Sequence, residues 1–116
     1  MENAEAVQVI QKQVDAYNAR DIERFLACYA ADAVILDGDG GTLYQGHEAI
    51  RAGYTGLFAQ NPAMHVEIPT RIAVGSWVFD EEIVTGLSME GGPTEAHAVA
   101  AYLVANGKIQ RVQLFS

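Results

Sequence analysis

The sequence predicts an α+β fold, in which three N-terminal helices precede and pack against a curved antiparallel sheet. Apolar residues recur at helical spacing through the first half of the chain. The second half consists of long segments rich in β-branched and aromatic residues, separated by short turns, and strands joined in this way pair antiparallel. The 116 residues are enough for one core, so a single domain is expected over residues 1–116.

The helices are predicted from the spacing of their apolar residues. A first helix over residues 5–19 places four such side chains on one face, namely Val7, Ile10, Val14 and Tyr17. A second helix within residues 20–30 repeats the pattern, and Asp21 is expected to cap its N-terminus. A third helix is predicted over residues 47–60, and the pair Asn61–Pro62 ends it.

The strands are predicted from their composition and from the turns between them. A short strand pair is expected around residues 34–45, and four longer strands are predicted within residues 64–74, 76–89, 94–105 and 108–116. The last two strands meet at Asn106–Gly107, which is typical of a tight hairpin turn. A long curved sheet with helices on one face forms a half-open cone, and its concave side is a natural binding site.

The charge of the chain argues against two classes of partner. The net charge is −8, from 7 basic and 15 acidic residues, and the few basic residues are scattered. Proteins that bind nucleic acid or anionic membranes usually show a basic stripe, so neither partner is expected. No apolar run approaches the roughly 20 residues of a membrane helix, and the N-terminus lacks the pattern of a signal peptide. We therefore expect a cytoplasmic protein.

Residues that could bind a metal are few and poorly spaced. The single cysteine, Cys28, lies in an apolar segment and is expected to be a buried, inert thiol. Asp37, Asp39 and Glu48 have the spacing of three calcium-loop ligands, but Thr42 stands where such a loop requires glycine. The three histidines have no zinc-site spacing. We expect no metal and no cofactor.

Three segments together resemble a known superfamily. They are "AYNARDIERFLACYAADAVILDGDG", "YQGHEAIRAGY" and the final "NGKIQRVQLF". The chain resembles the nuclear transport factor 2-like superfamily over nearly its whole length, and the SnoaL-like and ketosteroid-isomerase-like branch most closely. The resemblance implies a cone-shaped sheet and commonly a homodimer. It implies no single activity, because the superfamily includes isomerases, cyclases, hydrolases, dehydratases and binding modules.

The resemblance implies roles for three positions of the steroid isomerase pattern. Asp37 falls on the base that shuttles the proton, Gln13 on a tyrosine that donates to the oxyanion, and Val99 on a protonated acid that does the same. Tyr17 lies one helical turn from Gln13 and could reach the same space. Only the base is retained, and the missing oxyanion donors are worth several kcal/mol of barrier lowering.

Asp37 has two interpretations from its neighbours alone. It directly follows the apolar run "AVIL" and precedes "GDGG". As a turn residue, it would hold the loop through local hydrogen bonds. As a general base, it would place its carboxylate against the apolar walls of a pocket. Both interpretations stay open.

His97 is the second candidate catalytic residue. Strand alternation puts His97 and Val99 on one face, and the resemblance makes Val99 face the pocket. His97 would then share the cavity with Asp37, as an acid and a base. The alternative is a histidine that is hydrogen-bonded in the core or at a dimer surface.

Further side chains are candidates for the pocket wall. Three aromatic residues are predicted to contact the ligand, in addition to Gln13, Tyr17 and Val99, namely Tyr54, Phe58 and Trp77. Phe79 is a fourth aromatic that could line the pocket. Glu81 and Glu82 are adjacent in a strand, so they point to opposite faces, and the one that faces inward would be a second candidate acid.

Two functions remain open at this point. The first is a cofactor-independent SnoaL-like enzyme that moves a proton next to a carbonyl in a small apolar substrate, with Asp37 as the base. Isomerisation, cyclisation and dehydration all begin in this way. The second is a non-catalytic module that binds a small ligand or dimerises, and the missing oxyanion donors favour it. Nothing at clear spacing supports epoxide hydration.

Overall fold

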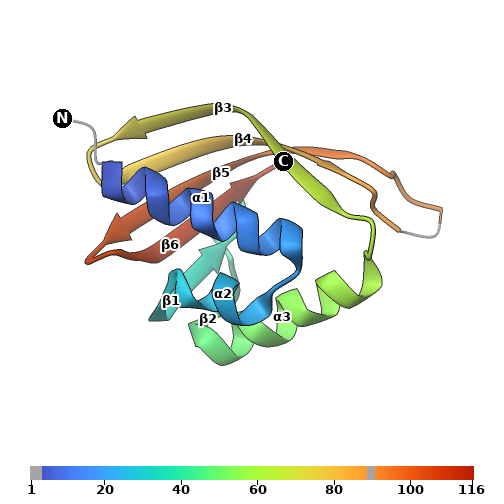
Figure 1. Cartoon of the computed structure of the whole chain (residues 1–116), viewed down its shortest axis with the longest axis horizontal. Helices are drawn as coiled ribbons and strands as arrows, with labels where there is room; N and C mark the ends of the chain where they lie inside the picture. The colour runs from blue at the N-terminus through green and yellow to red at the C-terminus, as the bar shows by residue number, and fades with distance from the viewer. Residues whose placement is uncertain (1–3, 89–90) are drawn as a thin grey trace.

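The computed structural model describes residues 4–88 and 91–116. The described part contains three helices, α1 (Ala4–Ala19), α2 (Ile22–Ala27) and α3 (Gly46–Gln60). Its strands are β1 (Tyr29–Leu36), β2 (Thr42–Gln45), β3 (His65–Val74), β4 (Trp77–Thr85), β5 (Ala96–Ala105) and β6 (Lys108–Phe115). Figure 1 shows the helices on one side of a curved sheet, which confirms the predicted α+β class.

The strands form one six-stranded sheet in the order β2-β1-β6-β5-β4-β3. The predicted meander is present, because β3, β4, β5 and β6 pair antiparallel with their neighbours in sequence. The pairing of β1 with β6 is parallel. Sequence pattern did not predict this pair, since the two strands are far apart in the chain and no local turn connects them. The sheet is therefore mixed.

Two local predictions are confirmed at the backbone level. The Asp21 side chain accepts a hydrogen bond from the backbone N–H of Arg24 and caps α2. Asn106 and Gly107 both have positive φ, 55° and 71°, as a two-residue hairpin turn requires. Tyr29 was placed within the second predicted helix but begins β1 instead. The strand predicted over 76–89 extends to Met89, which lies outside the described residues.

The sheet has a helix-covered face and an outer face. Val78, Asp80 and Tyr102 lie on the helix-covered face and are almost fully buried. Trp77 and Phe79 alternate with them on the outer face and are partly exposed. The suggestion that Trp77 and Phe79 line the pocket is therefore wrong.

The expected facing of β5 is also wrong. Ala100 and Tyr102 face the core, so His97 and Val99 lie on the outer face, where the His97 side chain is 67% exposed. The expectation depended on a count back from the hairpin turn that matched Val99 to a pocket-facing family position, but Ala98 and Ala100 are the residues that lie opposite the inward-facing Glu82 and Asp80. A shift of one residue moves every side chain of a strand to the opposite face.

Candidate functional site

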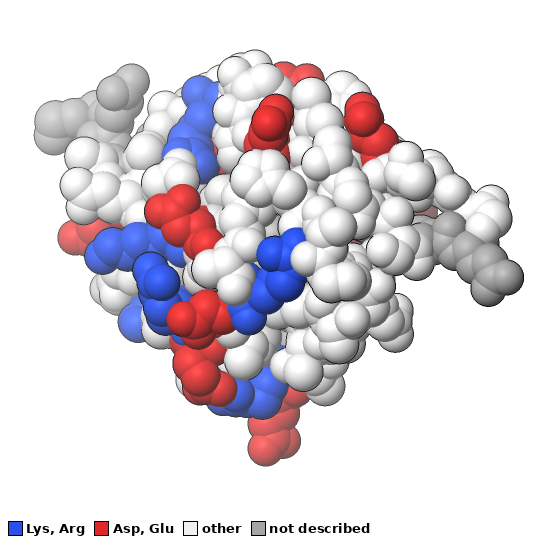
Figure 2. All heavy atoms as spheres, turned by 45° about the vertical axis from the view of Figure 1, so that its right-hand side comes forward, with Lys and Arg blue, Asp and Glu red and all other residues white. Residues whose placement is uncertain are grey.

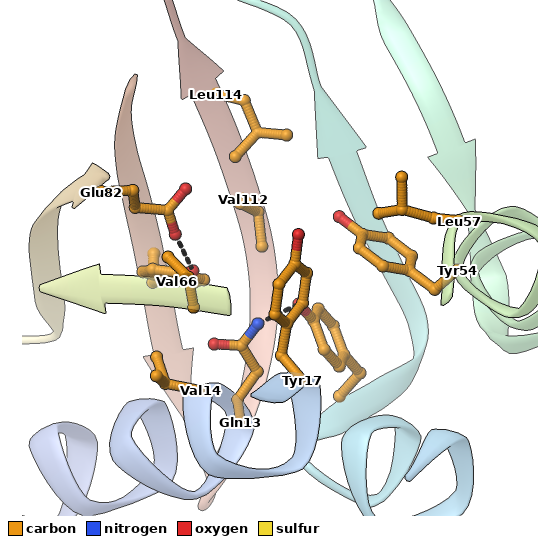
Figure 3. A pocket seen from close by; sticks show the side chains of 11 residues that line it. Gln13, Val14, Tyr17, Tyr54, Leu57, Val66, Glu82, Val112 and Leu114 are labelled. Carbon is orange, nitrogen blue, oxygen red and sulfur yellow. Dashed lines mark hydrogen bonds between the residues drawn. The ribbon is translucent and has the colours of Figure 1, made fainter. Parts of the chain in front are cut away.

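The candidate site is a cavity of about 160 Å³ between α1, α3 and the helix-covered face of the sheet (Figure 3). It is lined by Gln13, Val14, Tyr17, Tyr29, Tyr54, Leu57, Val66, Glu82, Tyr102, Val112 and Leu114. Three of the predicted ligand-binding residues, Gln13, Tyr17 and Tyr54, thus come together here. The predicted Phe58 lies behind them, with its ring 5.4 Å from that of Tyr17 and 6.2 Å from that of Tyr54.

Four tyrosine side chains contribute their hydroxyls to the lining of the cavity. The hydroxyls of Tyr17 and Tyr54 point into it (Figure 3). Burial raises the pKa of Tyr17, Tyr29, Tyr54 and Tyr102 above the ordinary value, so all four hydroxyls stay protonated at neutral pH. They can therefore donate hydrogen bonds to a ligand. The Tyr17 hydroxyl donates to the Met64 Sδ at 3.2 Å, and a thioether is a weak acceptor that a ligand can replace.

Glu82 is the carboxyl group of this lining. Burial, followed by the negative charge of Asp80, raises the pKa of Glu82 to about 7, although the hydrogen bond from Tyr102 acts in the opposite direction. That bond joins the Tyr102 hydroxyl to Glu82 Oε2 at 3.3 Å. A carboxyl group with a pKa near the working pH can both remove and return a proton. Glu82 is thus the inward-facing member of the pair Glu81 and Glu82.

A buried ion pair stands beside Glu82. Asp80 is fully buried, and its two carboxylate oxygens accept hydrogen bonds from Arg71 at 2.7 and 3.0 Å. Arg71 also donates to Gln11 Oε1 at 2.8 Å. The Arg71–Asp80 pair therefore joins β3, β4 and α1. The carboxylate of Asp80 is the negative charge that raises the pKa of Glu82.

Gln13 lies at the bottom of the cavity as Figure 3 draws it. Its amide Nε2 donates to the hydroxyl of Tyr29 at 3.3 Å, inside the core. Its Oε1 is buried and has no hydrogen-bond partner among the described residues. The amide is thus held in place through Nε2, while Oε1 accepts no hydrogen bond from the described residues.

Asp37 lies in the loop between β1 and β2. Its Oδ1 accepts hydrogen bonds from the backbone N–H groups of Asp39 and Gly41, both at 2.9 Å. Its own N–H donates to the Gly41 carbonyl at 2.8 Å, and its carbonyl accepts from Gln113. The carboxylate thus holds the glycine-rich loop, as the turn interpretation expects, and Asp37 is not among the residues that line the cavity. Its role as a base stays a prediction.

The structure does not bring His97 to Asp37 or to the cavity. His97 Nε2 lies 2.7 Å from Glu81 Oε2 on the outer face, so the sheet separates this pair from Glu82. Val99 lies on the same outer face. The contact between Glu81 and His97 lowers the pKa of Glu81. The second candidate acid is therefore Glu82, because Glu81 faces away from the cavity.

Sequence reasoning missed Tyr29 and Tyr102 and left Glu82 undecided between the two faces. A usable pattern was present in "WVFDEEIV", where strand alternation places Val78, Asp80 and Glu82 on one face and Trp77, Phe79 and Glu81 on the other. Two acidic side chains that share a face with a buried valine indicate a polar site within the core. The pattern alone, however, does not say which face the helices cover.

Metal binding and membrane insertion find no support in the part of the chain that the structure describes. Within residues 4–88 and 91–116, no group of three or more His, Cys, Asp or Glu side chains could hold a metal ion. No described helix is long and apolar enough to cross a membrane. On the face drawn in Figure 2, the Lys and Arg side chains lie among Asp and Glu side chains rather than in a separate basic stripe.

The chain is similar to known proteins in fold. The model of the SnoaL-like domain family matches residues 10–112. No curated protein matches the sequence. An uncharacterised cystatin-fold protein from Novosphingobium aromaticivorans is 29% identical, with a TM-score of 0.87 over 96% of this chain and 97% of that one.

Two further solved structures are more distant in sequence. A hypothetical protein with a ketosteroid-isomerase-like fold from Catenulispora acidiphila is 21% identical, with a TM-score of 0.76 over 93% of this chain and 84% of that one. An LEH-like epoxide hydrolase from Mycobacterium tuberculosis is 16% identical, with a TM-score of 0.81 over 96% and 81% of the two chains. At these identities the likeness concerns the fold alone.

Proposed function

The chain belongs to the SnoaL-like domain family, and from the geometry of its cavity we propose that it is an enzyme that moves a proton in a small, largely apolar carbonyl substrate. The observation that supports this most is the carboxyl group of Glu82. It lies in a cavity walled by aliphatic and tyrosine side chains, and its pKa is raised to about 7. Perturbed carboxyl groups in concave apolar sites are typical of acid–base catalysis.

The proposed reaction begins at Glu82. Its carboxylate removes a proton from the carbon next to the substrate carbonyl, and the electron pair of the broken C–H bond moves onto the carbonyl oxygen to give an enolate. The hydroxyls of Tyr17 and Tyr54 stabilise that oxygen by donating hydrogen bonds. In a β,γ-unsaturated substrate this enolate is a dienolate, and the protonated Glu82 returns the proton to the γ-carbon while the carbonyl re-forms and the double bond shifts into conjugation with it. Cyclisation or dehydration would start from the same enolate.

The size of the cavity limits the substrate. A volume of about 160 Å³ is close to that of engineered protein cavities, of order 150 Å³, that admit a benzene ring. We therefore propose substrates with a single six-membered ring rather than fused rings. The apolar lining residues, such as Val66, Val112 and Leu114, favour a ring with few polar substituents.

Asp37 is the alternative base, since the resemblance implies it. Exchange of the α-protons of monocyclic ketones in D₂O, followed by proton NMR, compares the two carboxyl groups without knowledge of the natural product. If Glu82 is the base, Glu82→Gln slows the exchange by about 10²- to 10⁴-fold, whereas Asp37→Asn does not. The opposite result would assign the base to Asp37.

A non-catalytic binding module is the second candidate function. It is favoured by the position of Asp37, whose carboxylate is engaged by its own loop, and by the outer-face position of His97. A binding module would be stabilised by ring ligands but would not accelerate α-proton exchange over the rate in buffer. The same NMR assay therefore separates the two functions.

We also propose that two copies of the chain associate through the outer face of the sheet. Six partly exposed hydrophobic side chains gather there, namely Ile72, Val74, Trp77, Phe79, Val99 and Phe115. Ile72 lies directly opposite Phe79 on β3 and β4, and Val99 lies directly opposite Phe115 on β5 and β6. Contiguous apolar patches of this kind mark interaction sites.

A further inference from the structure

The amide of Gln13 has one polar atom for which the fold provides no partner. Gln13 is 5% exposed, and its Nε2 is used by the hydroxyl of Tyr29. Its Oε1 is buried without a hydrogen bond among the described residues. Buried side-chain oxygens are nearly always hydrogen-bonded in folded proteins, so an exception in the wall of a cavity calls for a ligand atom that completes it.

Packing alone does not account for a glutamine at this position. Gln13 lies on the buried face of α1, next to Val14 and one turn after Ile10. An aliphatic side chain here would fill similar space without leaving a carbonyl oxygen unpaired. The fold therefore leaves Oε1 without a donor among the described residues, and a ligand hydroxyl that donates to it supplies that hydrogen bond.

The other polar groups of the cavity define the complementary ligand. The hydroxyls of Tyr17 and Tyr54 are donors that suit a carbonyl oxygen. The Oε1 of Gln13 is an acceptor only, so it suits a hydroxyl group. Figure 3 shows Gln13 at the bottom of the cavity, with Glu82 and Tyr54 on opposite sides above it.

We propose that Gln13 makes the cavity selective for ring compounds that carry a hydroxyl group, which donates its hydrogen bond to Oε1. The carbonyl of this ligand, which faces Tyr17 and Tyr54, is taken from the proposed function. The preference for a hydroxyl group does not depend on it. The selected ligands are neutral, because a negatively charged ring would lie close to the carboxyl groups of Glu82 and Asp80. The substrate class is thus a monocyclic hydroxy-carbonyl compound, with the hydroxyl and the carbonyl at different ends of the ring.

The first test compares two rings of nearly equal size, phenol and fluorobenzene, by isothermal titration calorimetry. Phenol donates a hydrogen bond and fluorobenzene does not. The wild-type chain is expected to bind phenol about 10-fold more tightly, which corresponds to one hydrogen bond to an otherwise unpaired buried group. Equal binding of the two rings, or no binding of either, overturns the inference.

Variants of Gln13 assign the preference to this residue. Gln13→Leu is expected to lose the preference for phenol while it keeps the affinity for fluorobenzene. Gln13→Glu retains an acceptor oxygen and is expected to keep the preference. Gln8→Leu changes an exposed glutamine of the same helix and serves as the matched control, with wild-type behaviour. If Gln13→Leu does not fold, Gln13→Met replaces it with an unbranched side chain of similar length.

Glu82→Gln separates this inference from the proposed function. Glu82 carries the other carbonyl-type acceptor in the cavity, so a preference that is lost in Glu82→Gln and kept in Gln13→Leu would assign the hydroxyl to Glu82 and overturn the inference. The proposed function fails independently, when Glu82→Gln leaves the α-proton exchange unchanged. Failure of one therefore does not imply failure of the other.

Discussion

Glu82 connects the chemistry of the cavity to the stability of the fold. The side chain is held on β4 with its carboxyl group among apolar and tyrosine side chains, where a negative charge is poorly solvated. Burial is the largest cause of its raised pKa, and the nearby Asp80 adds to it. The property that suits Glu82 for proton transfer is therefore also a stability penalty at neutral pH.

Replacement of Glu82 should reveal this penalty as a dependence on pH. The pKa of Glu82 rises from 4.5 to about 7 on folding, so between these values the folded chain holds a proton that the unfolded chain has lost. The free energy of unfolding consequently falls as pH rises through this window. At pH 8, Glu82→Gln is expected to be more stable than wild type by about 3 kcal/mol.

Urea denaturation of both proteins from pH 4 to pH 8 measures this difference. At the acid end of the series, where Glu82 is protonated in both the folded and the unfolded chain, the difference in free energy of unfolding between the two proteins should be smallest. The difference should grow as the pH rises to 8. A difference that does not change with pH would show that Glu82 titrates normally and is not buried in the folded chain.

Replacement of Asp37 should change the stability of the β1–β2 loop rather than the rate of proton exchange. Asp37→Ala removes the acceptor of two backbone N–H groups and is expected to cost about 1 kcal/mol. Asp37→Asn keeps Oδ1 and should be close to wild type in stability. Thermal unfolding at one pH checks both, and a larger loss for Asn than for Ala would contradict the loop role.

At the scale of the elements, the site depends on how β4 is held. Arg71 on β3 binds both carboxylate oxygens of Asp80 on β4 and also reaches Gln11 on α1. Asp80 and Glu82 lie on the same face of β4, two residues apart, so this ion pair also sets the position and the charge environment of Glu82.

Disruption of the Arg71–Asp80 ion pair should therefore change both the free energy of unfolding and the pKa of Glu82. Asp80→Ala leaves Arg71 without its carboxylate and is expected to cost about 3 kcal/mol, whereas the double change Arg71→Met with Asp80→Leu should cost less. In Asp80→Asn, the midpoint of the pH dependence of α-proton exchange should move to lower pH, because the charge of Asp80 raises the pKa of Glu82. A cycle of single and double variants in urea checks the first expectation, and an additive result would contradict it.

At the scale of the whole molecule, the two faces of the sheet have different roles. The helix-covered face holds the core and the cavity. The outer face exposes Trp77 and Phe79, whose rings stack at a centroid distance of 6.0 Å, among other apolar side chains. A face of this kind is unfavourable in water unless another surface covers it.

The proposed dimer gives a direct prediction for this face. The wild-type chain should sediment as a dimer, and Phe79→Lys should sediment as a folded monomer, because a lysine ammonium at the centre of the patch has no partner there. Leu43→Lys changes an exposed hydrophobic residue of β2, away from the patch, and should remain a dimer. Sedimentation equilibrium decides this, and a monomeric wild type would contradict the proposal.

The sequence by itself determined the order and type of the elements. Helical spacing, the Asp21 cap and the Asn106–Gly107 turn depend on residues that are neighbours in the chain, so they could be predicted without tertiary contacts. The resemblance led to Gln13, helical spacing from Gln13 added Tyr17, and Tyr54 was predicted as an aromatic residue of the pocket wall; all three line the cavity.

Only the tertiary structure decided which side chains meet. The parallel pairing of β1 with β6 depends on the whole chain, and the facing of β5 depends on which of its sides the helices cover. For this reason His97 lies outside, Glu82 lies inside, and Asp37 binds its own loop. An alternating strand pattern predicts that consecutive side chains face opposite sides of the sheet. Which side becomes the interior depends on long-range packing.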